Sequence, residues 1–200
     1  DTTNASRTLL YDINRLQWDE ELCRLFKIPV QALPEVRESM AVFGQTTLEG
    51  LLPSPIPICG VMGDSQASLF AQRCFAPGTA KVTFGTGSSL LLNIGSEVKL
   101  SNQGIVTAVA WVYRNQPTYA FEGLINFSAA TISWLKNQLR LIDSAAETEE
   151  LALSVDGNDG VYLIPAFVGL SAPYWQPDAR AAILGMTSAT TRAHVVRAAL

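Results

Sequence analysis

The sequence is poor in the residues from which several common kinds of active site are built. Its only histidine is His194, so a catalytic triad or a histidine-rich metal centre would depend on that one side chain. Its three cysteines, Cys23, Cys59 and Cys74, are odd in number and show no CxxC spacing, which argues against a disulfide framework and a zinc site. We therefore expect buried, reduced thiols in a cytoplasmic protein, and acid–base chemistry that depends on carboxylates.

Long apolar runs and clusters of basic residues are also missing. No stretch approaches the roughly 20 apolar residues of a transmembrane helix, so we expect no membrane partner. Lys and Arg are scattered singly along a chain of net charge −4, which argues against a nucleic-acid partner. What remains is an ordinary globular composition of 200 residues, 48% hydrophobic and 16% charged. The first residues resemble the middle of a loop and the last ones an uncapped helix, so we expect an internal fragment of a longer protein.

The hydrophobic pattern predicts a mixed α/β chain. An amphipathic helix is expected from Asp19, a short buried strand at 56–62, and a helix at 65–76. Strands are expected at 79–84, 89–94, 104–113 and 118–121, followed by helices at 125–139 and 145–153, strands at 161–165 and 181–186, and a helix beginning near Thr190. A meander of strands followed by alternating helices and strands indicates an α/β fold with a mixed sheet.

One acid stands at a predicted strand-to-helix junction. Asp64 follows Gly63 at the expected carboxyl end of a strand, the edge at which open α/β sheets bind ligands. Two interpretations are open from these residues alone. Asp64 is either an N-cap for the next helix or a general base that takes a proton from a substrate hydroxyl, and one residue can serve both roles.

A glycine-rich turn, Gly85-Thr86-Gly87-Ser88, joins two of the predicted strands. A hairpin uses glycine for its positive φ, whereas a phosphate site uses it to expose backbone N–H groups. In the second case the hydroxyls of Thr86 and Ser88 would act as further donors. The local sequence leaves both interpretations open. The turn comes one helix and one strand after Asp64, so we expect both to border the same cleft.

These motifs occur in a specific order along the chain. The stretch "GVMGDSQASLFAQRCFAPGTAKVTFGTGSSLLLNIG", with "YAFEGLINFSAATISWLK" and "VYLIPAFVGLSAPYWQPDARAAILGMT" after it, resembles the FGGY family of carbohydrate kinases, most closely its glycerol kinase branch. The resemblance implies a ribonuclease H-like α/β fold of the two-lobed actin and hexokinase type. It implies that residues 1–68 are the C-terminal part of the first, substrate-binding domain, and residues 69–200 the N-terminal part of the second, nucleotide-binding domain.

The resemblance also implies a reaction. The γ-phosphoryl group of ATP would pass to a hydroxyl of a small polyol or sugar, with Mg²⁺ on the phosphates. Asp64 would be the catalytic base, a substrate ligand, and a holder of Mg²⁺ through a water. Gly85, Thr86 and Gly87 would contact the nucleotide phosphates. A non-catalytic actin-like nucleotide-binding protein and a plain α/β interaction domain are the alternatives.

Four positions depart from the glycerol kinase pattern. Ser65 and Ser89 would bind substrate where that branch usually has Gln and Phe, and Ser89 would enlarge and wet the pocket. A longer polyol or a ketose, such as erythritol or xylulose, is therefore the alternative substrate. Ala129 and Ser133 replace the usual Gly and Gln near the nucleotide and would tune ATP affinity. We expect these 200 residues alone to be inactive, and the full-length enzyme to be a homodimer or homotetramer.

Two further groups are expected to be structural. In "APYWQPDARA" the aromatic pair is expected to fill a core or an interface, with Asp178 and Arg180 as an ion pair. Asn4 and Arg7 are expected to belong to a hydrogen-bond network between a loop and a helix.

Overall fold

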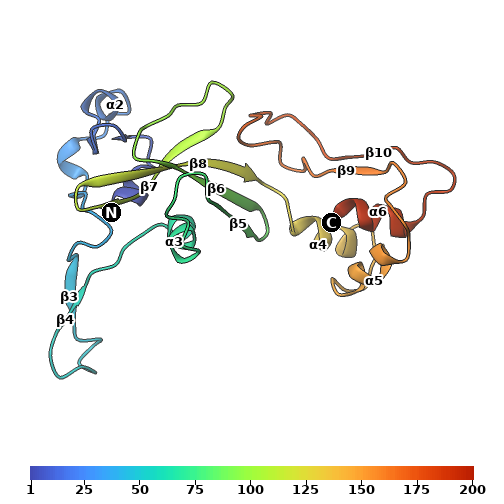
Figure 1. Ribbon diagram of the computed structural model, residues 1–200, viewed down its shortest axis with the longest axis horizontal. Coiled ribbons are helices and arrows are strands. Elements are labelled where there is room, and N and C mark those ends of the chain that lie inside the picture. Colours follow the sequence, from blue (N-terminus) through green and yellow to red (C-terminus); the bar gives the residue numbers. More distant parts are fainter. The chain divides into compact units, whose positions relative to one another are not determined.

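Short helices and strands lie along the whole chain, with four strands in succession between residues 80 and 125, as the hydrophobic pattern predicts. The structure, a computed structural model, describes residues 1–200 (Figure 1). Its helices are α1 (Thr2–Ala5), α2 (Glu20–Leu25), α3 (Asp64–Ala71), α4 (Ala130–Asn137), α5 (Glu147–Leu153) and α6 (Arg192–Ala199), with a 3₁₀ turn, η1 (Val30–Ala32). Its strands are β1 (Tyr11–Asp12), β2 (Gln17–Trp18), β3 (Gly44–Thr46), β4 (Ile56–Ile58), β5 (Ala80–Phe84), β6 (Ser88–Gly95), β7 (Val106–Tyr113), β8 (Gln116–Ile125), β9 (Tyr162–Ile164) and β10 (Ala182–Leu184).

The chain divides into two units. Unit 1 comprises Asp1–Lys81 and Leu90–Glu122, and unit 2 comprises Val82–Ser89 and Gly123–Leu200. These units are defined by contacts within each of them. The division expected from the resemblance, between residues 68 and 69, concerns family domains and stays a prediction.

The largest sheet has four strands in the order β5-β6-β8-β7. β7 and β8 form an antiparallel hairpin, with Val109 opposite Tyr119 and an irregularity between Val109 and Trp111. β7 is almost continuously buried because α3 covers one of its sides and α1 contacts it as well. The core of unit 1 is formed by Leu69 of α3 with Cys74, Leu91, Ala110, Trp111 and Ala120.

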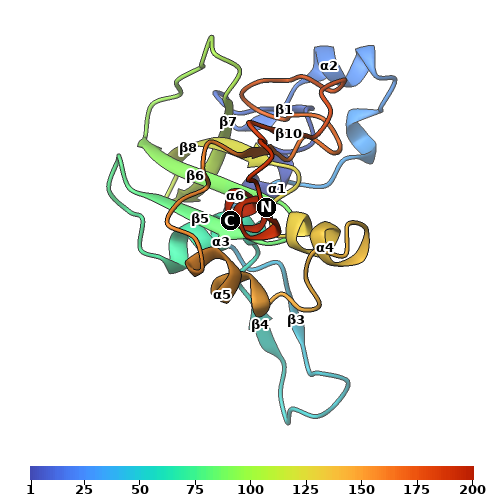
Figure 2. The same cartoon turned by 90° about the vertical axis from the view of Figure 1, so that its right-hand side faces the viewer.

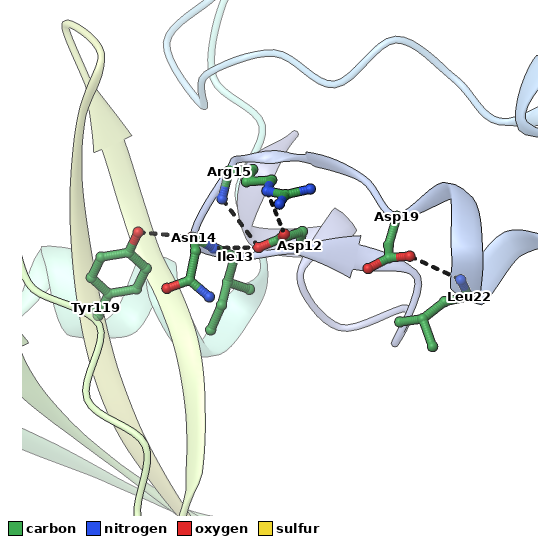
Figure 3. A network of polar contacts seen from close by, with 7 residues as sticks. All are labelled: Asp12, Ile13, Asn14, Arg15, Asp19, Leu22 and Tyr119. Atoms are coloured by element: carbon green, nitrogen blue, oxygen red, sulfur yellow. Dashed lines mark hydrogen bonds and ion pairs between the residues drawn. The ribbon is translucent and has the colours of Figure 1, made fainter.

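A polar network anchors the first turn of unit 1 to this sheet (Figure 3). Asp12 accepts hydrogen bonds from the backbone N–H groups of Asn14 and Arg15, at 2.8 and 3.1 Å, and so closes the turn between β1 and β2. The bond from the Arg15 N–H is the main cause that lowers the pKa of Asp12. The Tyr119 hydroxyl donates to the Ile13 carbonyl at 2.8 Å, which ties the turn to β8.

Unit 2 has its own core, built by α4, α5 and α6. Leu135 of α4 packs with Ile142 and with Val195 and Val196 of α6. The Arg197 guanidinium donates to the carbonyls at the end of α5 and just beyond it, Ala152 and Val155, at 2.6 and 2.7 Å. These charge-assisted bonds satisfy carbonyls that a helix end leaves without an intrahelical partner.

The order of the expected elements is confirmed, but the predicted boundaries of some elements and the predicted burial of others are wrong. The expected buried strand at 56–62 is the exposed three-residue strand β4, which pairs only with β3. In both views this hairpin extends away from the four-stranded sheet (Figures 1 and 2). Cys59, which follows it, is exposed, unlike the buried Cys23 and Cys74. The helix expected at 125–139 begins only at Ala130 because β8 continues to Ile125.

Candidate active site

Asp64 is the first residue of α3, and Gly63 is its N-cap. The N-cap interpretation of Asp64 is therefore wrong by one position. Gly63 has φ −58° and ψ 142°, so the chain turns into the helix there. One carboxylate oxygen of Asp64 accepts the Ser65 N–H at 2.6 Å, and the side chain is exposed. An acid in the first turn is stabilised by the helix dipole while it stays accessible to a ligand.

The backbone before Asp64 is held by a hydrogen bond from outside the helix. The Thr3 hydroxyl accepts the Gly63 N–H at 2.8 Å. The side chain of Gln66 also lies close to Gly63, because a Cβ atom built there would come within 2.6 Å of its Oε1 atom. A larger residue at position 63 would therefore displace the Gln66 amide.

Two buried charged residues of unit 1, Lys81 and Glu122, were not predicted from the sequence. Lys81 of β5 is only 4% exposed, and Glu122 of β8 only 5%. Glu122 forms an ion pair with Arg7, so Arg7 has a charged partner as well as a structural role. Burial lowers the pKa of Lys81, whereas the negative charges of Glu122 and Asp64 act in the opposite direction. The field of Asp64 therefore reaches a buried cation within the same unit.

The glycine-rich turn connects β5 to β6 and also holds the start of α4. The Thr86 carbonyl accepts the Ser128 N–H at 2.8 Å, and the Gly85 carbonyl accepts the Ala129 N–H at 3.0 Å. Neither glycine of the turn has a positive φ, so the hairpin rationale for them is wrong. Gly87 is needed for close approach instead, because a Cβ there would lie 2.6 Å from the Ile125 carbonyl oxygen.

Unit 2 brings the predicted nucleotide-binding residues together. Gly85, Thr86 and Gly87 form the turn, Ala129 is hydrogen-bonded to it, and Ser133 follows one helical turn later on α4. Thr86, Ala129 and Ser133 are exposed, as nucleotide contacts must be.

The serines beside these residues have different environments. Ser88 is buried and its hydroxyl donates to the Ser128 hydroxyl at 2.7 Å, so it serves the packing of the turn. Ser65 and Ser89 are half-buried and lie in different units. The cleft that we expect Asp64 to share with the turn likewise concerns two units, and it stays a prediction.

One groove in unit 1 is apolar and does not include Asp64. It has a volume of about 700 Å³ and is lined by the segment before α3 and by aromatic side chains, among them Phe70, Phe75 and Trp111. No group of three His, Cys, Asp or Glu side chains is placed to hold a metal ion. None of the helices combines the length and the apolar character that a membrane span requires.

Of the two groups expected to be structural, the pair Asn4 and Arg7 is confirmed for Asn4 but not for Arg7, which pairs with Glu122 of β8, and the other group is wrong in detail. Asn4 belongs to a network around α1, in which its side-chain amide donates to Asp1 at 2.6 Å. The Arg180 guanidinium donates to the carbonyls of Pro177 and Ala179 rather than pairing with Asp178. The aromatic pair of "APYWQPDARA" is more than half exposed and fills no core of unit 2.

Comparison with known proteins agrees with this architecture. The chain is similar to a crystal structure of Plasmodium falciparum glycerol kinase with ADP, with a TM-score of 0.89 and 42% sequence identity, covering all of this chain and 40% of that one. The fold is thus the actin and hexokinase-like fold of sugar kinases. The family model for the C-terminal domain of FGGY carbohydrate kinases matches residues 80–200, and that for the N-terminal domain matches residues 1–71. The chain belongs to the FGGY family of carbohydrate kinases.

The similar curated proteins are glycerol kinases. The chain is 54% identical over its whole length to glycerol kinase 1 of Thermotoga maritima and 49% identical to the glycerol kinase of Desulfitobacterium hafniense. It spans 40% of the length of each of these relatives.

Proposed function

We propose that the protein to which this sequence belongs transfers the γ-phosphoryl group of ATP to a hydroxyl of a small polyol or sugar. The observation that carries this proposal is the exposed carboxylate of Asp64 in the first turn of α3, directly after the Gly63 peptide that is hydrogen-bonded to Thr3. Family membership and the glycine-rich turn attached to α4 support it. Phosphoryl transfer depends mainly on positioning and charge stabilisation, so one acid and one phosphate cradle are sufficient protein groups.

In this proposal Asp64 accepts the proton of the substrate hydroxyl. Its exposed side chain can reach a ligand, and its contact to the Ser65 N–H orients one oxygen and leaves the other for the substrate. Lys81, a buried cation on which the negative charge of Asp64 acts, lies within the same unit.

The glycine-rich turn would bind the phosphates of ATP. Its Gly85 and Thr86 carbonyls hold α4, and the Gly85 N–H donates to the Gly87 carbonyl at 2.9 Å. In this proposal the Thr86 and Gly87 N–H groups and the exposed Thr86 hydroxyl would donate to an anion. Ala129 and Ser133 would line the nucleotide on α4. Mg²⁺ would enter as part of the nucleotide substrate, since a single carboxylate, Asp64, fits an ion that is held mostly by phosphates and water.

The substrate depends on the two serines. Ser65 and Ser89 are smaller than the Gln and Phe usual in glycerol kinases, so we propose a polyol or ketose longer than glycerol as the alternative to glycerol itself. A phosphorylation screen of the full-length protein against glycerol, tetritols, pentitols and ketopentoses measures this directly. The highest kcat/KM for glycerol would contradict the inference from the two serines.

The decisive test of the proposed reaction is Asp64→Asn in the full-length protein. We expect kcat to fall by about three orders of magnitude while ATP binding is retained, because the isosteric amide cannot accept the proton. Asp143→Asn, which alters another exposed aspartate, is the matched control and should leave kcat unchanged. Unchanged turnover in Asp64→Asn would favour the non-catalytic nucleotide-binding alternative.

The proposal includes the cellular location and the oligomeric state of the enzyme. The absence of disulfides and the two buried cysteines support a cytoplasmic location. We also propose that the full-length enzyme is a homodimer or homotetramer, which light scattering on the purified protein measures.

A further inference from the structure

We infer that Thr3 is a positioning residue for Asp64, and that the carboxylate of Asp1 holds it in that role. This inference rests on the proposed function, because it assigns a purpose to the backbone from which the acid projects. Thr3 does not touch a substrate. It acts through the peptide N–H of Gly63, the residue directly before Asp64.

The hydrogen bonds have only one possible direction. The Asp1 carboxylate has no proton to donate, so the Thr3 hydroxyl must donate to it, at 2.9 Å to the nearer oxygen. The oxygen of the Thr3 hydroxyl is then left with its lone pairs and accepts the Gly63 N–H at 2.8 Å. A side chain that cannot both donate and accept at this position breaks the chain of bonds.

The Asp1 carboxylate is itself fixed from several sides. The backbone N–H groups of Thr3 and Asn4 donate to it at 3.1 and 3.2 Å, which makes it the N-cap of α1. The Ser39 hydroxyl donates to it at 2.6 Å from a distant part of the chain. Thr3 has no exposed surface and Ser39 is only 4% exposed, so this network lies in the protein interior. Hydrogen bonds are stronger there than in water, and a buried polar group that loses its partner lowers the stability of the fold.

This network acts on the backbone directly before the acid. The N-cap of α3, Gly63, has no side chain with which to cap the helix. Asp64 itself is exposed and accepts the N–H of the next residue, Ser65, at 2.6 Å. The bond to Thr3 therefore fixes the Gly63 peptide plane from outside the helix. A shift of about 1 Å in a catalytic group can cost about 100-fold in rate.

The test compares Thr3→Val with Thr3→Ser in the full-length enzyme. Valine keeps the shape and burial of threonine but can neither donate nor accept, so we expect kcat to fall by about 10- to 100-fold with KM for ATP unchanged. Serine keeps the hydroxyl and should restore kcat to within about threefold. Thr148→Val is the matched control. It removes a buried hydroxyl of α5 that donates to the Ala145 carbonyl at 2.7 Å, and it should leave kcat unchanged.

A double-mutant cycle separates a positioning role from a general loss of structure. If Thr3 acts through Asp64, adding Thr3→Val to Asp64→Asn lowers kcat no further, because the group that was positioned is already gone. Equal kcat for Thr3→Val and the wild type, or full additivity of the two substitutions, would overturn the inference. Loss of activity in Asp64→Asn with wild-type kcat in Thr3→Val would leave the proposed function intact and refute only the role of Thr3.

Folding of each variant is checked by its unfolding temperature. If Thr3→Val does not fold, Asp1→Asn addresses the same network, since its amide keeps the shape but lacks one of the accepting oxygens. We expect that variant to lower kcat at unchanged KM for ATP. A kcat equal to that of the wild type would refute the inference.

Discussion

The ion pair between Arg7 and Glu122 gives the most direct test of how unit 1 is stabilised. The Glu122 side chain is only 7% exposed, whereas that of Arg7 is 41% exposed. Replacing Arg7 by Met removes the positive partner and leaves a carboxylate that cannot return to water. Replacing Glu122 by Gln leaves a guanidinium that can, while the buried Lys81 keeps the negative charge of Asp64 as a partner. We therefore expect Arg7→Met to be the more destabilising of the two substitutions.

The size of the effect follows from the exposure of the two partners. Breaking a fully buried ion pair by removing one partner costs about 3 to 5 kcal/mol. Here the guanidinium is partly solvated, which weakens its attraction to Glu122, and the buried Lys81 supplies a second positive charge that acts on the same carboxylate. We expect Arg7→Met to lower the free energy of unfolding by about 2 kcal/mol, and Glu122→Gln by about 1 kcal/mol.

The assay is urea denaturation of the full-length protein followed by circular dichroism. The combined variant Arg7→Met/Glu122→Gln removes the unpaired charge, so it should be more stable than Arg7→Met alone. Two results contradict this explanation: a loss below about 0.5 kcal/mol in Arg7→Met, the range of an ordinary surface substitution, or a double variant less stable than the single one.

Two further predictions concern the turn and the core of unit 1. Gly87→Ala should destabilise the full-length protein by about 2 kcal/mol and weaken ATP binding, because the added Cβ meets rigid backbone. Gly85→Ala should cost clearly less, since its Cβ would lie 3.3 Å from the Gly87 carbonyl oxygen. Equal unfolding temperatures and ATP affinities for the two variants would contradict this prediction. Burial and the neighbouring Tyr119 raise the pKa of Tyr11 to about 12. Tyrosine is neutral in both states below its unfolded pKa of about 10, so the free energy of unfolding should fall only as the pH rises from about 10 to about 12. In Tyr11→Phe the free energy of unfolding should decrease less over this pH range than in the wild type. Identical decreases in the two proteins, measured by urea denaturation, would refute the raised pKa of Tyr11.

The sequence predicts the order of elements well where hydrophobic pattern and burial agree. The strands of the four-stranded sheet are found where alternating or continuous apolar residues indicate them, and α6 begins after Thr191 as its pattern indicates. The pattern is misleading where apolar residues remain exposed. Leu25 and Phe26, at the end of α2, are 71% and 57% exposed, so their helical spacing does not mark a buried face in this unit.

The candidate site is predictable only in its local parts. Asp64 and the turn at Gly85–Ser88 can be found by inspection because each lies in a short motif. The contacts of Thr3 with Gly63 and of Arg7 with Glu122 join residues that are far apart in the sequence, and no local pattern encodes such a pairing. The reason for glycine at position 87 is also invisible in the sequence, since it depends on the approach of a carbonyl from β8.

The bond between Thr3 and Gly63 spans 60 residues of chain. During synthesis α3 can therefore coil before this bond forms, since helices close within microseconds from local contacts, while a loop of this length must first lose conformational entropy. A nascent chain would pass through a stage in which α3 has formed but the peptide before Asp64 is not yet held by Thr3. The same order applies to damage: loss of the bond between Thr3 and Gly63 would leave the local hydrogen bonds of α3 in place while it releases the peptide before Asp64.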